Sequence, residues 1–187
     1  MRRGYAVQMP RKPREEEAGA IVHVFARGNN RQRIFCCDYD RELYLSLLAQ
    51  VVARQGWLCL SYCLMHNHVH LLVETPSPNL GGGMQRLHSL YAQAFNKRHG
   101  RCGHVFQGRF GGNRVRTDEQ LLTTTRYIAL NPVEAGLCDA PGEWPWSSHA
   151  AVVGRVAAPK WLAVARLLGF FGLWGGEPRA RYETFVR

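Results

Sequence analysis

The hydrophobic and polar positions of the chain follow two different periods. Apolar residues fill Ala20–Ala26 and Trp57–Glu74 almost without interruption, which is typical of buried strands. Three other stretches repeat apolar residues every three or four positions, as amphipathic helices do: from Asp38 or Asp40 to about Arg54, 84–97 and 119–130. A further strand is expected around Asn113–Arg116. The predicted order is therefore strand, helix, strand, strand, helix, strand, helix.

The stretch Trp57–Glu74, WLCLSYCLMHNHVHLLVE, is too long to be one strand, since strands usually have about 5–6 residues. Asn67 is the strong turn former within it, so the break is expected at His66–Asn67. The result is an antiparallel hairpin whose second strand opens with His68. We therefore predict an α+β fold: a ferredoxin-like or RRM-like antiparallel sheet with helices packed on one face. The other face would then be free to meet a substrate.

Two histidines stand at the start of the second hairpin strand. Side chains alternate along a strand, so His68 and His70 point to the same face, with Cα atoms about 7 Å apart. Two imidazoles at that spacing can bind one metal ion. The alternative is a pair of histidines with ordinary polar partners on the sheet. His66 falls in the turn and is expected to be a bystander.

The length of 187 residues and the 46% of hydrophobic residues fit one folded domain. We divide the chain into a flexible, charged arm (1–19), a main domain (20–150) and a C-terminal extension (151–187) that contains a helix over 159–171. No apolar run approaches the roughly 18 residues that a membrane helix needs, and the N-terminus lacks a signal-peptide core. The expected location is the cytoplasm.

The net charge of +10 and the isoelectric point near 9.8 favour a polyanionic partner, nucleic acid before membrane. Positive charge is concentrated between residues 97 and 117, where six basic residues occur without an acidic one. Glycines in this segment alternate with Phe106 and Phe110, which could stack on bases. A solvated basic loop is the alternative. The candidate DNA-binding residues are Lys97, Arg98, Arg101, Arg109, Arg114 and Arg116.

Tyr127 and Asn131 are four residues apart and share one face of the third predicted helix. An Asn oxygen is a hard ligand that suits Mg²⁺ or Mn²⁺, and a Tyr hydroxyl can attack phosphorus to form a covalent intermediate. Spacing alone does not select this tyrosine, because six others compete and Tyr91 is the strongest rival.

Four motifs add a family resemblance over about Ile21 to His149: HNHVHLLVE, GHVFQGRF, RYIALNPVEAGL and WPWSSH. In this order they resemble the HUH single-tyrosine transposases, specifically the REP-associated tyrosine transposases. The resemblance implies that His68 and His70 bind a divalent metal, that Asn131 completes the metal site and that Tyr127 is the nucleophile. Tyr91 then becomes a packing residue. The family often has Pro where this chain has His66, which leaves a spare imidazole near the metal.

The activity that the resemblance implies is cleavage and rejoining of single-stranded DNA at hairpin-forming palindromes through a 5′-phosphotyrosine. Residues 20–150 would be the catalytic domain, Mg²⁺ or Mn²⁺ the cofactor, and DNA hairpins the partner. A monomer is favoured over a swapped dimer because of the C-terminal extension. The alternatives are a non-catalytic nucleic-acid-binding module and a domesticated relative that binds palindromes without mobilising DNA.

Overall fold

The computed structural model describes residues 16–172 and 176–187, and the expected arm lies outside them up to residue 15. Within these residues, no helix is both long and apolar enough to cross a bilayer.

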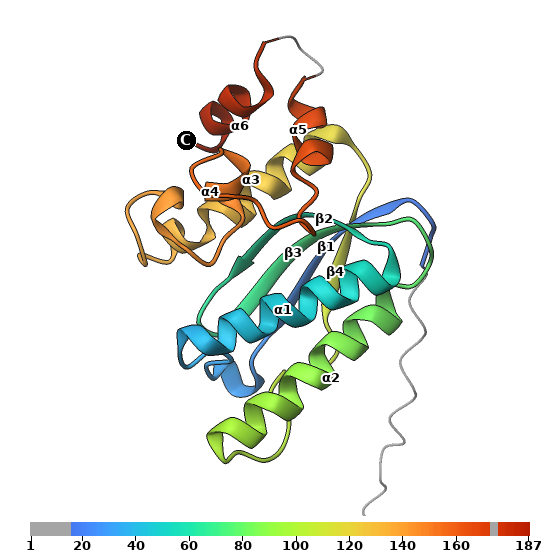
Figure 1. The fold of residues 1–187 in the computed structure, drawn as a ribbon, viewed down its shortest axis with the longest axis vertical. Helices are drawn as coiled ribbons and strands as arrows, with labels where there is room; N and C mark the ends of the chain where they lie inside the picture. The colour runs from blue at the N-terminus through green and yellow to red at the C-terminus, as the bar shows by residue number, and fades with distance from the viewer. Residues whose placement is uncertain (1–15, 173–175) are drawn as a thin grey trace, which may run out of the picture.

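Figure 1 shows the fold. The main elements are β1 (Ala20–Arg27), α1 (Asp38–Gln55), β2 (Leu58–Leu64), β3 (His68–Thr75), α2 (Leu80–His99), β4 (Gly111–Val115) and α3 (Asp118–Glu134).

The four strands form one antiparallel sheet in the order β2-β3-β1-β4. The succession β1-α1-β2-β3-α2-β4 is the ferredoxin-like arrangement, so the predicted α+β class and antiparallel sheet are confirmed. The hairpin turns where it was expected, and the Met65 N–H donates to the carbonyl of His68 at 2.9 Å. His68 is the first residue of β3, as predicted.

Each face of the sheet carries its own hydrophobic core. Val24 and Leu71 belong to the core under α1 and α2, whereas Leu72 belongs to a second core with Ile128 of α3. Figure 1 shows α1 and α2 together on one side of the sheet and α3 on the other. The helices expected on one face are therefore α1 and α2, and the second face is also partly covered.

Helix α2 begins at Leu80, four residues earlier than predicted. The expected start at Met84 leaves out the three preceding glycines, but Gly83 lies against Trp57: a Cβ at this position would come within 2.2 Å of the indole ring. Asn79 precedes the helix and accepts a hydrogen bond from Trp57 Nε1 at 2.6 Å. A glycine is needed here for close packing rather than for a turn.

Helix α3 does not stop at Asn131–Pro132, which corrects the sequence-based boundary. It continues to Glu134, with both residues buried inside it. Pro132 has no N–H, so one intrahelical hydrogen bond is missing. The next turn still closes, since the N–H of Ala135 donates to the carbonyl of Asn131 at 3.1 Å. Asn131 is therefore held on a regular helix rather than at a frayed end.

Three C-terminal helices complete the second core: α4 (His149–Val152), α5 (Val164–Gly172) and α6 (Pro178–Val186). Helix α5 starts five residues later than the predicted helix, and the boundary drawn after residue 150 falls inside α4. Leu167, Phe171 and Tyr182 lie in the same cluster as Ile128 of α3. The extension thus packs against the helix that carries Tyr127.

The segment Trp144–Ser148 pairs with the outer edge of β2. The N–H of Leu64 donates to the carbonyl of Trp146 at 2.9 Å, and the N–H of Ser148 donates to the carbonyl of Tyr62 at 3.0 Å. Pairing of this kind satisfies backbone groups that an edge strand would otherwise leave open. The segment closes one edge of the sheet.

Candidate nucleophile and metal-ligand cluster

The four residues predicted to form the site lie together on the second face of the sheet. His68 and His70 project from β3, with ring centroids 5.0 Å apart. Helix α3 brings Tyr127 to His70, with ring centroids 5.3 Å apart, and brings the side chain of Asn131 to His68. Residues more than fifty positions apart in the sequence therefore share one cluster.

His68 lies between two amide oxygens. Its Nδ1 is 2.7 Å from Oδ1 of Asn67, and its Nε2 is 3.1 Å from Oδ1 of Asn131. The Asn67 amide is oriented by its own donation to the carbonyl of Arg31 at 3.0 Å. A neutral imidazole has one N–H and can satisfy only one of the two oxygens. Burial lowers the pKa of His68, which disfavours the doubly protonated ring.

A divalent cation at this point would satisfy both groups. If Nδ1–H donates to Asn67, then Nε2 and the Asn131 oxygen both present lone pairs to the same point. Their separation of 3.1 Å is close to the roughly 3.0 Å between neighbouring ligands that each lie about 2.1 Å from an octahedral Mg²⁺. The amide oxygen is a donor that suits Mg²⁺ or Mn²⁺, and imidazole is a donor that transition metals prefer.

His70 also has an unsatisfied nitrogen. Its Nε2 is buried and has no hydrogen-bond partner in the described part of the chain. An unsatisfied buried polar atom costs about 1–3 kcal/mol. Burial lowers the pKa of His70 to about 3, so the ring is neutral at physiological pH, as a metal ligand must be. The residues present therefore fit a bound cation.

Two side chains of β1, which the sequence analysis does not predict, also lie at the site. His23 stacks on His70 with ring centroids 5.2 Å apart, and Arg27 pairs in register with His68. The expected strand covers Ala20–Ala26, and no role is predicted for His23 or for Arg27 after it. The available signal was its alternation, because His23, Phe25 and Arg27 occupy every second position and so share the face of His70.

The two rival tyrosines have opposite environments. The Tyr127 side chain is 42% exposed beside His70, where a substrate can reach it. Tyr91 is a fully buried residue of α2, and its hydroxyl donates to the carbonyl of Ile34. Tyr91 is a packing residue, as the family resemblance implied.

The spare imidazole of His66 has other partners. Its Nδ1 is 2.9 Å from a guanidinium nitrogen of Arg41, and its ring meets the ring of Trp144 edge-on at 5.6 Å. Burial, and then the nearby positive charge of Arg41, lower the pKa of His66. The structure thus places this histidine in a contact with Arg41 and Trp144 rather than with His68 and His70.

The six predicted DNA-binding residues fall into two groups. Lys97 and Arg109 form no ion pair within the described residues. Arg116, after β4, donates its backbone N–H to Gln120. The side chains of the other three already have partners: Arg98 with Asp40, Arg101 with Gln32 and Arg114 with Glu17.

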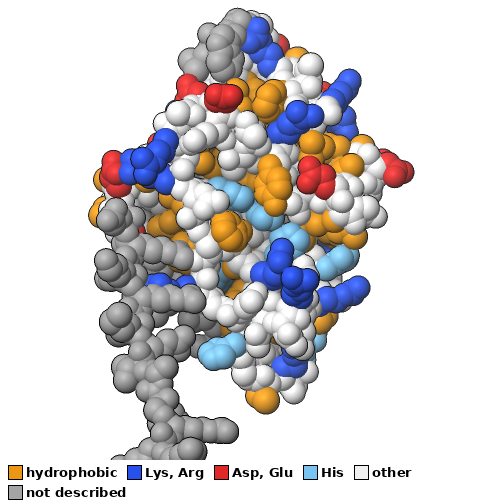
Figure 2. Space-filling view, turned by 180° about the vertical axis from the view of Figure 1, so that it is seen from behind, with side chains coloured by type: hydrophobic (Ala, Val, Ile, Leu, Met, Phe, Trp, Pro, Cys, Tyr) orange, Lys and Arg blue, Asp and Glu red, His pale blue; other side chains and the backbone are white. Residues whose placement is uncertain are grey.

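Figure 2 shows histidine side chains near the middle of one face, with groups of Lys and Arg on both sides of them.

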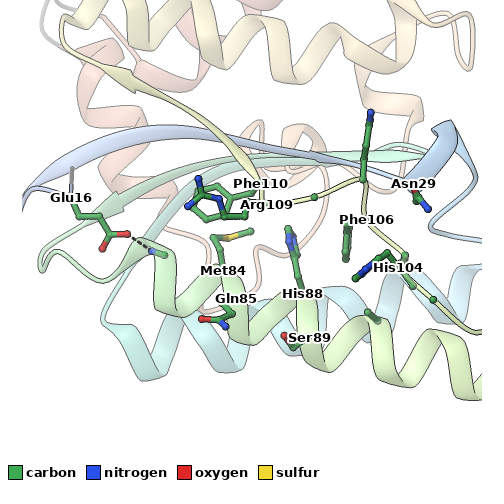
Figure 3. Close-up of a pocket in the computed structure, with 16 residues that line it drawn as sticks. Glu16, Asn29, Met84, Gln85, His88, Ser89, His104, Phe106, Arg109 and Phe110 are labelled. Carbon is green, nitrogen blue, oxygen red and sulfur yellow. Dashed lines mark hydrogen bonds between the residues drawn. The ribbon is translucent and has the colours of Figure 1, made fainter. Parts of the chain in front are cut away.

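A separate cavity of about 700 Å³ lies between α2 and the segment before β4. Its lining includes Met84, His88, Phe106 and Phe110, with Arg109 beside them (Figure 3). Met84 and the two phenylalanines belong to the core under α1 and α2. The cavity is therefore on the opposite face of the sheet from His70.

Comparison with known proteins finds relatives in sequence and in fold. A curated relative from Haemophilus influenzae bears the name of a REP-associated tyrosine transposase and is 26% identical over 144 residues, covering 71% of this chain and 81% of its own length. A solved REP-associated tyrosine transposase bound to a REP hairpin has the same fold, with a TM-score of 0.66 and 18% identity. That match covers 81% of this chain and 89% of the other.

The family described as "Transposase IS200 like" matches residues 18–131, which is more than half of the chain. The matched region runs from β1 to Asn131 and so contains both histidines and Tyr127. The chain belongs to the IS200-like transposase family and is similar to its REP-associated tyrosine transposases.

Proposed function

We propose that the protein cleaves and rejoins single-stranded DNA at hairpin-forming, REP-type palindromes, with Tyr127 as the nucleophile. One observation carries the proposal: an exposed tyrosine lies against a buried histidine whose Nε2 has no partner in the described residues. A nucleophile beside an incomplete ligand set is the arrangement expected for metal-assisted phosphoryl transfer.

His68, His70 and Asn131 would hold the divalent cation, Mg²⁺ or Mn²⁺. The supporting observations are the 3.1 Å separation between His68 Nε2 and Asn131 Oδ1 and the unpartnered Nε2 of His70. When bound there, the cation would polarise a non-bridging oxygen of the scissile phosphate. The lowered pKa values of both rings favour the neutral form, whose lone pair is free for this purpose.

Tyr127 would form the covalent bond. Its phenol oxygen attacks phosphorus while the bond from phosphorus to the 3′ oxygen breaks. The phenol releases its proton, and the departing oxygen takes one up. The products are a 5′-phosphotyrosine and a free 3′-OH. The phosphotyrosine is still a phosphodiester, so a 3′-OH can attack it and rejoin strands without ATP.

Basic side chains on both faces would hold the DNA. Arg27 is exposed and lies directly opposite His68, where its guanidinium can contact a phosphate next to the scissile one. Lys97 and Arg109 carry charge that no described acid neutralises, so they suit contacts to the rest of the hairpin. The REP hairpin bound by the solved relative supports the choice of substrate.

One chain would suffice for catalysis, because Tyr127 lies beside His70 of its own chain. A monomer with an active site in cis is therefore the simplest assembly. A swapped dimer would need α3 to leave the second core.

The test is to incubate a 3′-labelled REP-type hairpin with the protein and Mn²⁺ and to run a denaturing gel, because a 5′-phosphotyrosine keeps the 3′ part of the strand on the protein. A covalent protein–DNA band is expected with the wild type and not with Tyr127→Phe. A band that persists in Tyr127→Phe overturns the nucleophile. If hairpins bind in a native gel and no covalent band forms, the chain is a non-catalytic binding module.

A further inference from the structure

His23 and His70 share one hydrogen bond whose direction decides the chemistry of His70. The distance from His23 Nε2 to His70 Nδ1 is 3.0 Å, and the two rings are stacked at an interplanar angle of 30°. Each neutral imidazole has one N–H, so one ring donates and the other accepts. Two arrangements are possible, and they leave different atoms at the unpartnered end of His70.

In the first arrangement His23 donates, and the proton of His70 must sit on Nε2. That N–H would be buried with no acceptor in the described part of the molecule. In the second arrangement His70 donates from Nδ1, and its Nε2 carries a lone pair. Only the second arrangement allows Nε2 to bind a cation.

We propose that His23 is a positioning residue: it accepts the Nδ1–H of His70 and so keeps His70 Nε2 available as a metal ligand. The inference rests on the proposed function, because it requires a cation held by His68, His70 and Asn131. Histidine ligands almost always donate their other N–H to an acceptor, which fixes the tautomer and the ring orientation.

The neighbouring ligand shows the same design. The Nδ1 of His68 is 2.7 Å from Oδ1 of Asn67, so each proposed ligand histidine has one oriented acceptor behind it. For His68 the acceptor is an amide oxygen, and for His70 it is a second imidazole. In both cases Nε2 is the atom left for the cation.

The ring of His23 is itself held in place. Phe25 lies on the same strand with its ring centroid 5.6 Å away, and Tyr127 meets His23 edge-on at 5.9 Å. His23 therefore links β1 to both the ligand histidine and the nucleophile. It contacts no reacting atom directly, so its effect should be greatest on metal binding.

The test measures the Mn²⁺ dissociation constant of the full chain by calorimetry or electron paramagnetic resonance. His23→Phe keeps an aromatic ring but removes the acceptor, and should weaken Mn²⁺ binding about 10–100-fold. His23→Gln places an amide oxygen near the position of Nε2 and should restore most of the affinity. His104→Gln, an exposed histidine in the segment before β4, serves as the control.

A second measurement does not depend on whether the variants fold. Long-range ¹H–¹⁵N NMR of the metal-free wild type should show His70 as the Nδ1–H tautomer. Finding the Nε2–H tautomer, or wild-type Mn²⁺ affinity in a folded His23→Phe, overturns the role of His23 and leaves the proposed function intact. A wild type that binds no Mn²⁺ overturns the metal site as well.

Discussion

The sheet carries a histidine–tyrosine cluster on each face, and the two clusters differ in what their polar atoms contact. On one face, Tyr44 of α1 and Tyr91 of α2 are fully buried, and both hydroxyls have partners: Nε2 of His88 at 3.4 Å and the carbonyl of Ile34. Under α3, Tyr127 is 42% exposed, and Nε2 of His70 is buried without a partner in the described residues.

Burial does not distinguish the two clusters, because it lowers the pKa of both histidines. The pKa of His88 falls to about 4 and that of His70 to about 3, so both rings are neutral at pH 7. What distinguishes them is satisfaction of hydrogen bonds. A satisfied cluster stabilises the fold, whereas a buried nitrogen left open beside an exposed hydroxyl is suited to bind a ligand.

Matched tyrosine substitutions should give the largest contrast. Tyr127→Phe removes an exposed hydroxyl and should abolish the covalent DNA adduct with little change in the free energy of unfolding. Tyr91→Phe should keep the adduct but leave the carbonyl of Ile34 unpaired, at a cost of about 1–3 kcal/mol. Denaturing gels and urea unfolding measure the two effects. Loss of the adduct in a folded Tyr91→Phe would contradict the division between the clusters.

Removal of a proposed ligand should come next. Asn131→Leu deletes the oxygen that lies 3.1 Å from His68 Nε2 and should weaken Mn²⁺ binding by at least about 100-fold, more than the usual loss of a supporting residue. Asn96→Leu on α2 is the control and should bind Mn²⁺ like the wild type. If calorimetry gave the same Mn²⁺ affinity for both variants, Asn131 would not be a metal ligand.

Acid should destabilise the satisfied cluster. The unfolded chain protonates His88 near its ordinary pKa of about 6.5, whereas the folded protein does so near 4, so the unfolded state binds more protons between these values. The contribution to stability is complete above pH 6.5 and is lost as the pH falls. His88→Phe should reduce the slope of the free energy of unfolding against pH by up to about 1.4 kcal/mol per pH unit. Urea unfolding between pH 7 and pH 4 would show an unchanged slope if this assignment were wrong.

The smallest effects are expected at the surface. Arg109→Ala should weaken hairpin binding and reduce the slope of log affinity against log salt by about 0.9 if the side chain contacts one duplex phosphate. Arg114→Ala should change the slope less, because Glu17 already neutralises this charge. Fluorescence anisotropy in a KCl series measures hairpin binding by the two variants. Equal slopes would contradict the distinction between Arg109, without an acidic partner among the described residues, and Arg114, which has one.

Local sequence pattern was sufficient to predict the order of strands and helices along the chain, the hairpin break and the shared face of His68 and His70. These features depend on the spacing of apolar and polar residues along the chain and on a turn-forming residue only a few positions away. The selection of Tyr127 over Tyr91 depended on the family resemblance, since both tyrosines lie on amphipathic helices. The structure adds the physical difference between them, which is exposure.

The remaining features depend on contacts between distant segments. His23 meets His70 only through the register of β1 against β3, which no local pattern reports. The early start of α2 depends on the fit of Gly83 against Trp57. The passage of α3 through Pro132 conflicts with local preference and is sustained by burial of that turn.

The packing of the last two helices beneath α3 bears on how this protein can be engineered. Val186 is fully buried, while Arg187, one residue later, is exposed. A purification tag or fusion partner joined after Arg187 therefore starts outside the core. A shortened version that ends near residue 150 would lose the apolar contacts that α5 and α6 make in the core shared with α3, the helix that carries Tyr127. Inactivity of such a version would therefore not identify a catalytic residue.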